Sequence, residues 1–386
     1  MADHKPNILF LASWYPNQLL PKNGNFIQQH ALAVSLYCNV SVLHIIAREQ
    51  QEKFVIEENS QNGVVEVIVY YQKIKGSTPI HQLQKLNRRH KAHLKGYQTI
   101  LKKVKKIDVT HLNVVFPAGS FAVYLKKKYK IPFIISENWT VLLDSNPIQL
   151  NSIAKSIVQR TLNYADVLCP VSNDLKKALM KLTDRSTFEI IPNVVNTNHF
   201  KYVEHPLGKR ILHISNLKDE HKNITGILDT IKELSSHRTD FCITIAGNGD
   251  AHYFNQYAEK IGIPKNLYTI EGSKTYLEVA QLMQTHDLFL LYSNYENLPC
   301  VISEALVCGM PILTSKAGGT DEMVDESNGI VIPAKNNKIL LEKLNYLLDH
   351  LANYNNEQIA KNAVSVYSYQ SVGNQFLRIY NQLISK

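Results

Sequence analysis

The sequence predicts an α/β protein in which two doubly wound, Rossmann-like domains face a central cleft. The chain has 386 residues, 45% of them hydrophobic and 19% charged, which is enough apolar material for two cores of ordinary size. Short apolar runs alternate with helical patterns along nearly the whole chain, as expected for parallel sheets with right-handed crossovers. A polar stretch from Pro192 to Gly208 separates two such series.

Each series supplies one domain. In the first we expect strands at Ile8–Leu11, Val40–Ile45, Val64–Val69, Val109–Leu112, Phe133–Ile135, Val167–Cys169 and Glu189–Ile191. In the second we expect strands at Ile211–Ile214, Ile243–Ala246, Tyr268–Ile270, Leu288–Leu291, Ile312–Thr314 and Ile330–Ile332. We therefore place the domains at residues 1–195 and 196–367, with a closing helix at 368–386 that packs back on the first domain.

The most informative segment joins a buried strand to a helix in the second series. The apolar run Leu288–Tyr292 leads into a polar turn with Glu296, and Pro299 can open a helix that carries Glu304 and ends at Gly309. Ligands of open α/β sheets bind at such strand ends, and helix N-termini attract phosphate. This pattern favours a phosphorylated, hydroxyl-rich ligand, although solvated surface glutamates explain the same spacing equally well.

Other candidate residues follow predicted strands in the same way. Gly24 lies in a strand–turn–helix segment, Lys222 lies in a loop where it can neutralise a diphosphate, and Gly318 can present backbone N–H groups to phosphate. Gly247 begins Gly-Asn-Gly, but His252 replaces the last glycine of a dinucleotide-binding fingerprint, so a tight turn near base or ribose is expected. A structural turn and an exposed lysine are alternatives of similar weight.

Two polar residues, His111 and Asn138, end first-domain strands and are expected at the cleft, although satisfied structural roles are more common for such residues. No Asp-x-Asp sequence occurs anywhere in the chain. We therefore expect no metal site, and assign charge neutralisation to Lys222 and helix dipoles.

Composition restricts the cellular setting. The five cysteines form no Cys-x-x-Cys pair, which favours a reducing compartment. No run of 18 apolar residues occurs, and Met1–Pro6 lacks the features of a signal peptide, so we expect a cytoplasmic protein.

The net charge of +9 is concentrated in a lysine-rich helix expected at residues 85–106 and a basic run at 126–130. An anionic membrane surface at the inner face of the cytoplasmic membrane is one expected partner of this helix, and a solvated helix face is an equally weighted alternative. Nucleic acid is not expected, because no recognition motif or aromatic-basic interleaving accompanies the charge.

The ordered motifs of the chain resemble those of glycosyltransferase family 4. The resemblance covers nearly the whole sequence and is densest from Ile243 to Ile332. It includes Ala-Gly-Asn-Gly, Glu-Gly-Ser, Ser-Asn-Tyr-Glu-Asn-Leu-Pro-Cys-Val-Ile-Ser-Glu-Ala and Cys-Gly-Met-Pro-Ile. The first domain adds Trp-Tyr-Pro, Pro-Ala-Gly and Ile-Pro-Asn. The family implies the GT-B fold and a retaining, nucleotide-sugar-dependent enzyme.

The resemblance also implies roles for matched positions. Glu296 would hold donor-sugar hydroxyls, Lys222 would contact the diphosphate and Glu304 would bind the ribose. The remaining implied donor-binding positions are Gly24, Asn216, Gly247, Ser273, Leu298, Cys300 and Gly318.

Three departures from the family pattern accompany this match. Many relatives carry Gly-Arg where this chain has Ser215-Asn216, so one phosphate cation is missing or is replaced by Lys218. Many relatives carry histidine where this chain has Asn138. The asparagine side chain can hydrogen-bond a sugar hydroxyl, but it cannot shuttle a proton. Asn297 replaces a common glycine.

The implied function is a metal-independent, hexosyltransferase-type reaction that needs no cofactor. A UDP- or GDP-linked sugar would pass to a glycan or lipid-linked acceptor in bacterial cell-surface polysaccharide synthesis, with Glu296, Lys222 and Asn138 as the expected catalytic group. Acceptor contacts are expected in the loops Trp14–Asn25 and Thr140–Leu150. The alternative is a catalytically impaired, nucleotide-sugar-binding scaffold of a polysaccharide assembly complex, motivated by Asn138 and Asn216.

Overall fold

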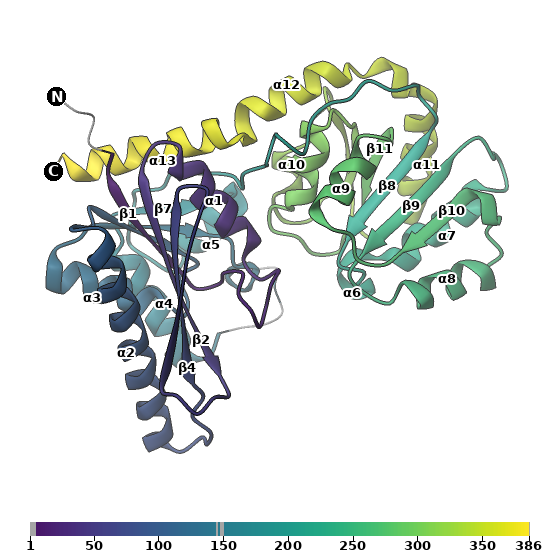
Figure 1. Ribbon diagram of the computed structural model, residues 1–386. Helices are drawn as coiled ribbons and strands as arrows, with labels where there is room; N and C mark the ends of the chain where they lie inside the picture. Colours follow the sequence, from purple (N-terminus) through teal and green to yellow (C-terminus); the bar gives the residue numbers. More distant parts are fainter. Residues whose placement is uncertain (1–4, 144–145, 147–149, 386) are drawn as a thin grey trace.

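A computed structural model describes residues 5–143, 146 and 150–385 of the chain. It contains two α/β domains side by side, each built on a sheet with parallel core strands (Figure 1). The first sheet has the order β3-β4-β2-β1-β5-β6-β7, and the second has the order β10-β9-β8-β11-β12-β13. The mixed α/β class and the two Rossmann-like sheets predicted from the sequence are confirmed.

The element bounds are as follows. The first sheet comprises β1 (Asn7–Ala12), β2 (Asn39–Arg48), β3 (Phe54–Gln61), β4 (Val64–Gln72), β5 (Val109–Asn113), β6 (Phe133–Glu137) and β7 (Val167–Pro170). Its helical segments are α1 (Asn25–Ser35), α2 (Pro79–Lys103), α3 (Gly119–Tyr129), the 3₁₀ turn η1 (Thr140–Leu142), α4 (Ser152–Tyr164) and α5 (Asn173–Met180).

The second sheet comprises β8 (Arg210–Ser215), β9 (Cys242–Gly247), β10 (Tyr268–Glu271), β11 (Leu288–Leu291), β12 (Ile312–Ser315) and β13 (Gly329–Ile332). The remaining helical segments are α6 (Asp219–Lys222), α7 (Ile224–Leu234), α8 (Ala251–Lys260), η2 (Lys265–Leu267), α9 (Tyr276–Met283), α10 (Cys300–Val307), η3 (Gly318–Glu322), α11 (Asn337–His350), η4 (Leu351–Asn353), α12 (Asn356–Tyr367) and α13 (Tyr369–Ile384).

Both sheets are buried on their two faces. Along β1, Leu9 and Leu11 belong to one apolar cluster, whereas Ile8 and Phe10 belong to a second cluster on the opposite face. Successive side chains of a strand point to opposite faces, so a strand covered on both sides is apolar throughout. This explains why short apolar runs located nearly all the strands.

The strand predicted at Glu189–Ile191 is wrong. The segment runs beside β7, and the backbone N–H groups of Glu189 and Ile191 donate to Leu168 and Pro170. Pro170 and Pro192 have no N–H, so the ladder does not extend beyond an isolated bridge. Conversely, β3 was not predicted, because this antiparallel edge strand is largely polar and exposed.

The lysine-rich helix also differs from its expected bounds. Helix α2 begins at Pro79, where Thr78 caps it, and ends at Lys103 rather than at 106. Val104 has extended backbone geometry, and Lys106 instead forms an ion pair with Asp108. Within the described part of the chain, no helix combines the length and apolarity needed to span a bilayer.

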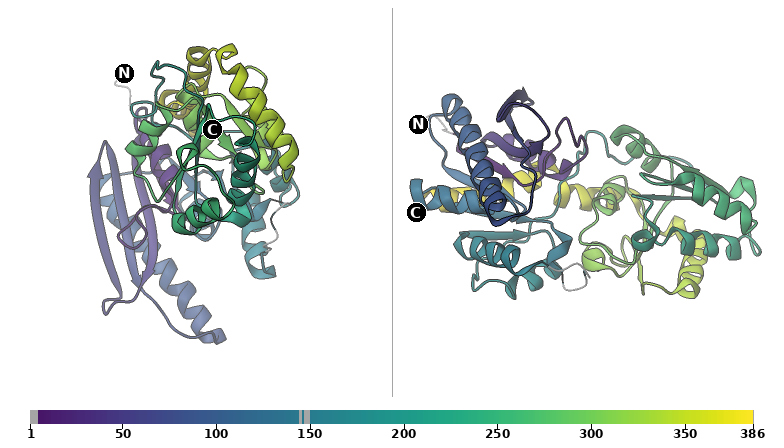
Figure 2. Two further views of the ribbon diagram at one scale, coloured as in Figure 1. Left: turned by 90° about the vertical axis from the view of Figure 1, so that its right-hand side faces the viewer. Right: turned by 90° about the horizontal axis from the view of Figure 1, so that it is seen from below.

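The C-terminal helices connect the two domains. Helix α12 packs on α10 in the second domain, while α13 packs on α1 in the first (Figure 1 and Figure 2). Gly373 permits this close approach, because a Cβ there would lie 2.3 Å from the carbonyl oxygen of Ala33. The backbone N–H of Val195 donates to Tyr367 at 2.8 Å and ties the linker to the end of α12.

A buried polar network holds α13 against the first sheet. The hydroxyl of Tyr380 lies 2.6 Å from Nδ1 of His111, and the Oγ atom of Ser136 lies 2.7 Å from Nε2. His111 is fully buried, and burial lowers its pKa well below the ordinary value. The expectation that His111 faces the cleft is therefore wrong, since both ring nitrogens are engaged inside the domain.

We predict that Tyr380→Phe lowers the free energy of unfolding by about 1–2 kcal/mol, because it leaves a ring nitrogen of His111 buried without a partner. Urea unfolding followed by circular dichroism measures the change. Tyr346→Phe is the matched control, because Tyr346 is about half exposed and stacks on His350. Equal stability of the two variants would contradict the assigned role of the network.

Candidate functional site

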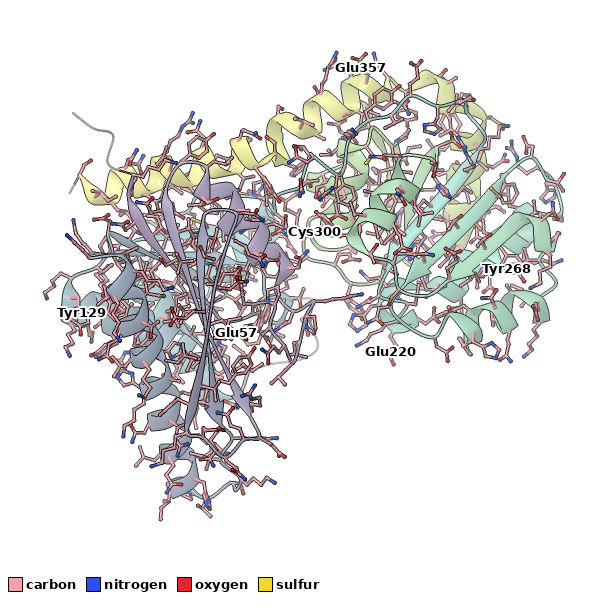
Figure 3. The ribbon with its side chains drawn as sticks, viewed as in Figure 1. Glu57, Tyr129, Glu220, Tyr268, Cys300 and Glu357 are labelled. Carbon is pink, nitrogen blue, oxygen red and sulfur yellow. The ribbon has the colours of Figure 1, made fainter. Side chains whose placement is uncertain are left out.

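The candidate site is a cavity of about 640 Å³ between the domains. Thr140 and Leu143 line it from the first domain, and Lys222, Glu296 and Lys335 line it from the second. Figure 3 shows Cys300 and Glu220 on the side of the second domain that faces the first. Of the predicted acceptor loop Thr140–Leu150, residues 144–145 and 147–149 lie outside the described part of the chain.

The central feature of this cavity is an ion pair between Lys222 and Glu296. The ammonium of Lys222 donates to Oε1 of Glu296, and the hydroxyl of Ser293 donates to the same oxygen at 2.6 Å. Both charged side chains are mostly buried, with 14% and 9% of their surface exposed. The sequence placed the two residues at one site but did not predict that they would contact each other.

Local backbone geometry brings the two charged residues together. Helix α6 is four residues long, and Asn223 adopts a left-handed conformation that separates it from α7. The backbone N–H of Asn294 donates to the carbonyl of His221 at 2.7 Å. This bond joins the α6 turn to the loop after β11, so Lys222 faces Glu296.

Glu304 lies on the second turn of α10, as predicted. Its carboxylate makes no hydrogen bond or ion pair with any residue that the structure describes. Burial raises its pKa to about 8. Pro299 is the N-cap of α10 rather than its first residue, because its ψ of 117° is not helical.

Two of the predicted donor-binding glycines allow close backbone contacts between loops. Gly24 has a φ of +69°, and a Cβ there would lie 2.6 Å from the backbone of Trp14. Gly318 has a φ of +57°, and its Cβ would lie 2.2 Å from the carbonyl oxygen of Glu296. Any other residue would strain the backbone and displace these loops, so Gly318 supports the position of the Glu296 loop and Gly24 supports the turn before α1.

A smaller hollow of about 140 Å³ lies at the ends of β8 and β9. Ser215, Gly247 and Ser273 line it from the second domain, and Lys22 reaches it from the first. The hydroxyl of Ser273 donates to Oδ1 of Asn248 at 3.3 Å. Gly247 and Ser273, two of the predicted donor-binding positions, therefore share one concave surface.

Asn138 contacts protein groups on both sides of the interdomain boundary. Its side-chain amide donates to Asn193 at 2.7 Å, and its backbone carbonyl accepts from the amide of Asn297 at 2.9 Å. Asn216 is exposed and lines the main cavity, whereas Leu298 packs against apolar clusters of both domains. Cys300 begins α10, and burial raises its thiol pKa to about 12.

Three residues near the cavity were not predicted. Glu137 is fully buried, and its carboxylate accepts backbone N–H groups of Val115, Asn138 and Trp139 at 2.8–2.9 Å. Burial raises its pKa to about 7, while these bonds act in the opposite direction. In the sequence, Glu137 is the single charged residue at the end of an apolar strand, and this feature could have identified it.

The other two unpredicted residues are Tyr295 and Lys335, which line the cavity together. The ammonium of Lys335 lies 5.9 Å from the centre of the Tyr295 ring. Tyr295 directly precedes Glu296, which could have drawn attention to it. Lys335 has no such signal, because it follows β13 and reaches the cavity only through the fold.

Comparison with known proteins identifies two family matches. Residues 195–365 match the family described as glycosyl transferases group 1, and residues 42–199 match glycosyltransferase family 4. Among curated proteins, the chain is 21% identical to the "Putative teichuronic acid biosynthesis glycosyltransferase TuaC" of Bacillus subtilis (strain 168), over 96% of this chain and 94% of TuaC. It is 26% identical to the uncharacterized glycosyltransferase MJ1178 of Methanocaldococcus jannaschii, over 66% of this chain and 68% of that protein.

Solved structures share the two-domain fold. Sucrose-phosphate synthase from Thermosynechococcus elongatus aligns with a TM-score of 0.73 at 13% identity, over 99% of this chain and 100% of that chain. Anabaena HepE in complex with UDP and glucose aligns with a TM-score of 0.70 at 16% identity, over 98% and 100%. These likenesses confirm the GT-B architecture expected from the motifs.

We predict that Glu304→Gln stabilises the unliganded protein increasingly as pH rises from about 4.5 to about 8. A raised carboxyl pKa means that the folded state binds the proton more tightly, so wild type loses stability across this window and the amide variant does not. The expected difference at pH 8 is on the order of 2 kcal/mol, allowing for screening by the open cleft.

Thermal unfolding at several pH values measures this difference. Glu326→Gln, at an exposed position, is the matched control and should show no such pH dependence. A constant offset between Glu304→Gln and wild type would contradict the burial assigned to Glu304.

Proposed function

The chain belongs to the glycosyltransferases of the family 4 type, and we propose that it moves a sugar from a nucleoside diphosphate sugar to a glycan or lipid-linked acceptor. The observation that carries the proposal is the Lys222–Glu296 pair at the interdomain cavity, beside the N-terminus of α10. A diphosphate attracts the ammonium and the helix end, while sugar hydroxyls donate to the carboxylate. When a donor binds, its diphosphate therefore replaces Glu296 as the partner of Lys222, and its sugar hydroxyls replace Lys222 as the partners of Glu296.

The donor lies across the carboxyl ends of the second sheet. The base occupies the hollow with Gly247 and Ser273, the ribose donates to Glu304, and the diphosphate lies near Lys222 and Gly24. Glu304 suits the ribose because its carboxylate has no partner among the described residues. UDP and GDP are the proposed leaving groups. Lys222 and the α10 N-terminus supply the positive charge, so the reaction needs no metal ion.

Transfer proceeds with retention by attack on the face from which the diphosphate leaves. Double displacement needs a carboxylate nucleophile close to the anomeric carbon. Among the described residues that line the cavity, the carboxylates are Glu220 and Glu296, and we assign Glu296 to the hydroxyls of the donor sugar rather than to its anomeric carbon. The proton of the acceptor hydroxyl passes to the leaving phosphate. Trapping a covalent glycosyl-enzyme would contradict this route.

The biological setting is bacterial cell-surface polysaccharide synthesis. Two relatives support this setting by their names: TuaC is named for teichuronic acid biosynthesis, and a Salmonella typhi protein, similar over 29% of this chain, is named for Vi polysaccharide biosynthesis. We assign the enzyme to the inner face of the cytoplasmic membrane because α2 combines basic residues with the exposed apolar side chains of Ile80, Leu83 and Leu86.

A catalytically impaired scaffold is the second candidate. Its supporting observation is that the side-chain amide of Asn138 donates to Asn193 rather than facing an open site, while Asn216 supplies no charge. Donor hydrolysis or transfer by wild type that is lost in Glu296→Ala would exclude this candidate. Nucleotide binding without any turnover would favour it.

We predict that UDP or GDP raises the melting temperature of wild type, whereas ADP and CMP do not. Ligand at one hundred times its dissociation constant stabilises the folded state by about 2.7 kcal/mol. Lys222→Ala should abolish this shift, because it removes the ammonium and leaves Glu296 unpaired near the diphosphate. Lys260→Ala, at the end of α8 and away from the cavity, is the control. A shift retained in Lys222→Ala would contradict the assigned role of the ion pair.

We also predict that the protein binds phosphatidylglycerol vesicles and that added salt weakens binding. Leu83→Asp should reduce co-sedimentation severalfold, because a charge replaces a side chain that is 68% exposed on α2. Leu277→Asp, on α9 of the second domain at 55% exposure, is the matched control. Binding that ignores lipid charge, or equal losses in both variants, would contradict membrane docking through α2.

A further inference from the structure

One carboxylate crosses the interdomain boundary away from the cavity. Glu322 ends η3 in the second domain, and its side chain reaches the N-terminus of α5 in the first. Oε2 accepts the backbone N–H of Asn173 at 2.7 Å and its side-chain amide at 2.9 Å, and Oε1 accepts the backbone N–H of Asp174 at 2.9 Å. We call this set of three hydrogen bonds the interdomain tether.

The tether satisfies groups that the helix itself leaves free. The first N–H groups of an α-helix have no partner within the helix, and its N-terminus carries partial positive charge. Ser172 caps α5 through the N–H of Leu175 and leaves the N–H groups of Asn173 and Asp174 to Glu322. All three hydrogen bonds are solvent-exposed, so each one competes with water, but together they join the two domains at one point.

The same 3₁₀ turn touches the loop that carries Glu296. Gly318, at the start of η3, lies directly against the carbonyl of Glu296. The N–H of Gly319 donates to the carbonyl of Asn297 at 2.7 Å. Asn297 in turn contacts Ser172 and the backbone carbonyl of Asn138 in the first domain. A continuous series of contacts therefore connects α5, Glu322 and the backbone of Glu296.

We propose that Glu322 is a positioning residue for sugar transfer. It holds the Glu296 loop at one place relative to the first domain, so that a donor sugar on Glu296 meets an acceptor bound by the first domain. This inference rests on the proposed function. Most of the nucleotide contacts assigned above lie within the second domain, with Gly24 and Lys22 as the first-domain exceptions, so the tether governs transfer geometry rather than nucleotide affinity.

The test compares Glu322→Ala and Glu322→Gln with wild type in the full-length protein. In Glu322→Ala we expect kcat to fall about 10- to 100-fold, since small misplacements of reacting groups cost this much. The melting-temperature shift with UDP or GDP should remain. The kcat of Glu322→Gln should lie between those of wild type and Glu322→Ala, because the amide oxygen can still accept one hydrogen bond. Asp321→Asn is the matched control, because Asp321 pairs with Lys316 inside the second domain.

Two structural measurements accompany the kinetics. Hydrogen exchange at the amides of Asn173 and Asp174 should accelerate in Glu322→Ala and stay unchanged in Asp321→Asn. Small-angle scattering should show a wider distribution of interdomain distances in Glu322→Ala only.

Several outcomes overturn the inference. A kcat equal to wild type in Glu322→Ala, unchanged exchange at both amides, or an equal kcat loss in Asp321→Asn would each do so. Loss of the melting-temperature shift with UDP or GDP in Glu322→Ala would also overturn the inference, because it indicates damage to the donor domain itself. Failure of the proposed function is seen separately, as a wild-type protein that neither binds nucleotide nor transfers sugar. In that case, hydrogen exchange and small-angle scattering still test whether Glu322 holds the two domains together.

Discussion

The ion pair between Lys222 and Glu296 is the interaction on which the site depends. Both side chains are mostly shielded from water, and a buried charge without a partner costs several kcal/mol. In the unliganded protein each side chain neutralises the other, with Ser293 completing the shell of Glu296. In the proposed function, a donor supplies a diphosphate for the lysine and hydroxyls for the glutamate, so neither charge is left unpaired on binding. The pair therefore favours a ligand with those two features.

The architecture explains why this pair lies where a second substrate can reach it. Parallel strands end together, and the loops that follow β6 in the first sheet and β8 and β11 in the second line the cavity between the domains. Helices α12 and α13 join the domains on one side, where Tyr380 and His111 anchor α13. Glu322 connects them a second time through α5. The cavity is therefore bounded by two domains whose relative position depends on a few specific contacts.

Strands and motif residues could be predicted because their signals are local. Strands buried on both faces are continuous apolar runs, and Glu296 and Glu304 lie at fixed distances from one of them. The polar edge strand β3 lacks this signal. The apolar segment near Glu189 has the signal but forms only an isolated bridge, because the neighbouring prolines have no N–H to donate. The pairing of Lys222 with Glu296, and of Glu322 with α5, joins residues 74 and 149 positions apart. The first contact forms only when the second domain folds, and the second forms only when the two domains meet.

A crystal structure of the protein with a bound nucleoside diphosphate would show directly whether the ion pair opens for the donor. We expect the ammonium of Lys222 to leave Glu296 and contact a phosphate oxygen, while ribose hydroxyls donate to Glu304. A complex in which the Lys222–Glu296 pair is intact and the diphosphate lies elsewhere would contradict this expectation.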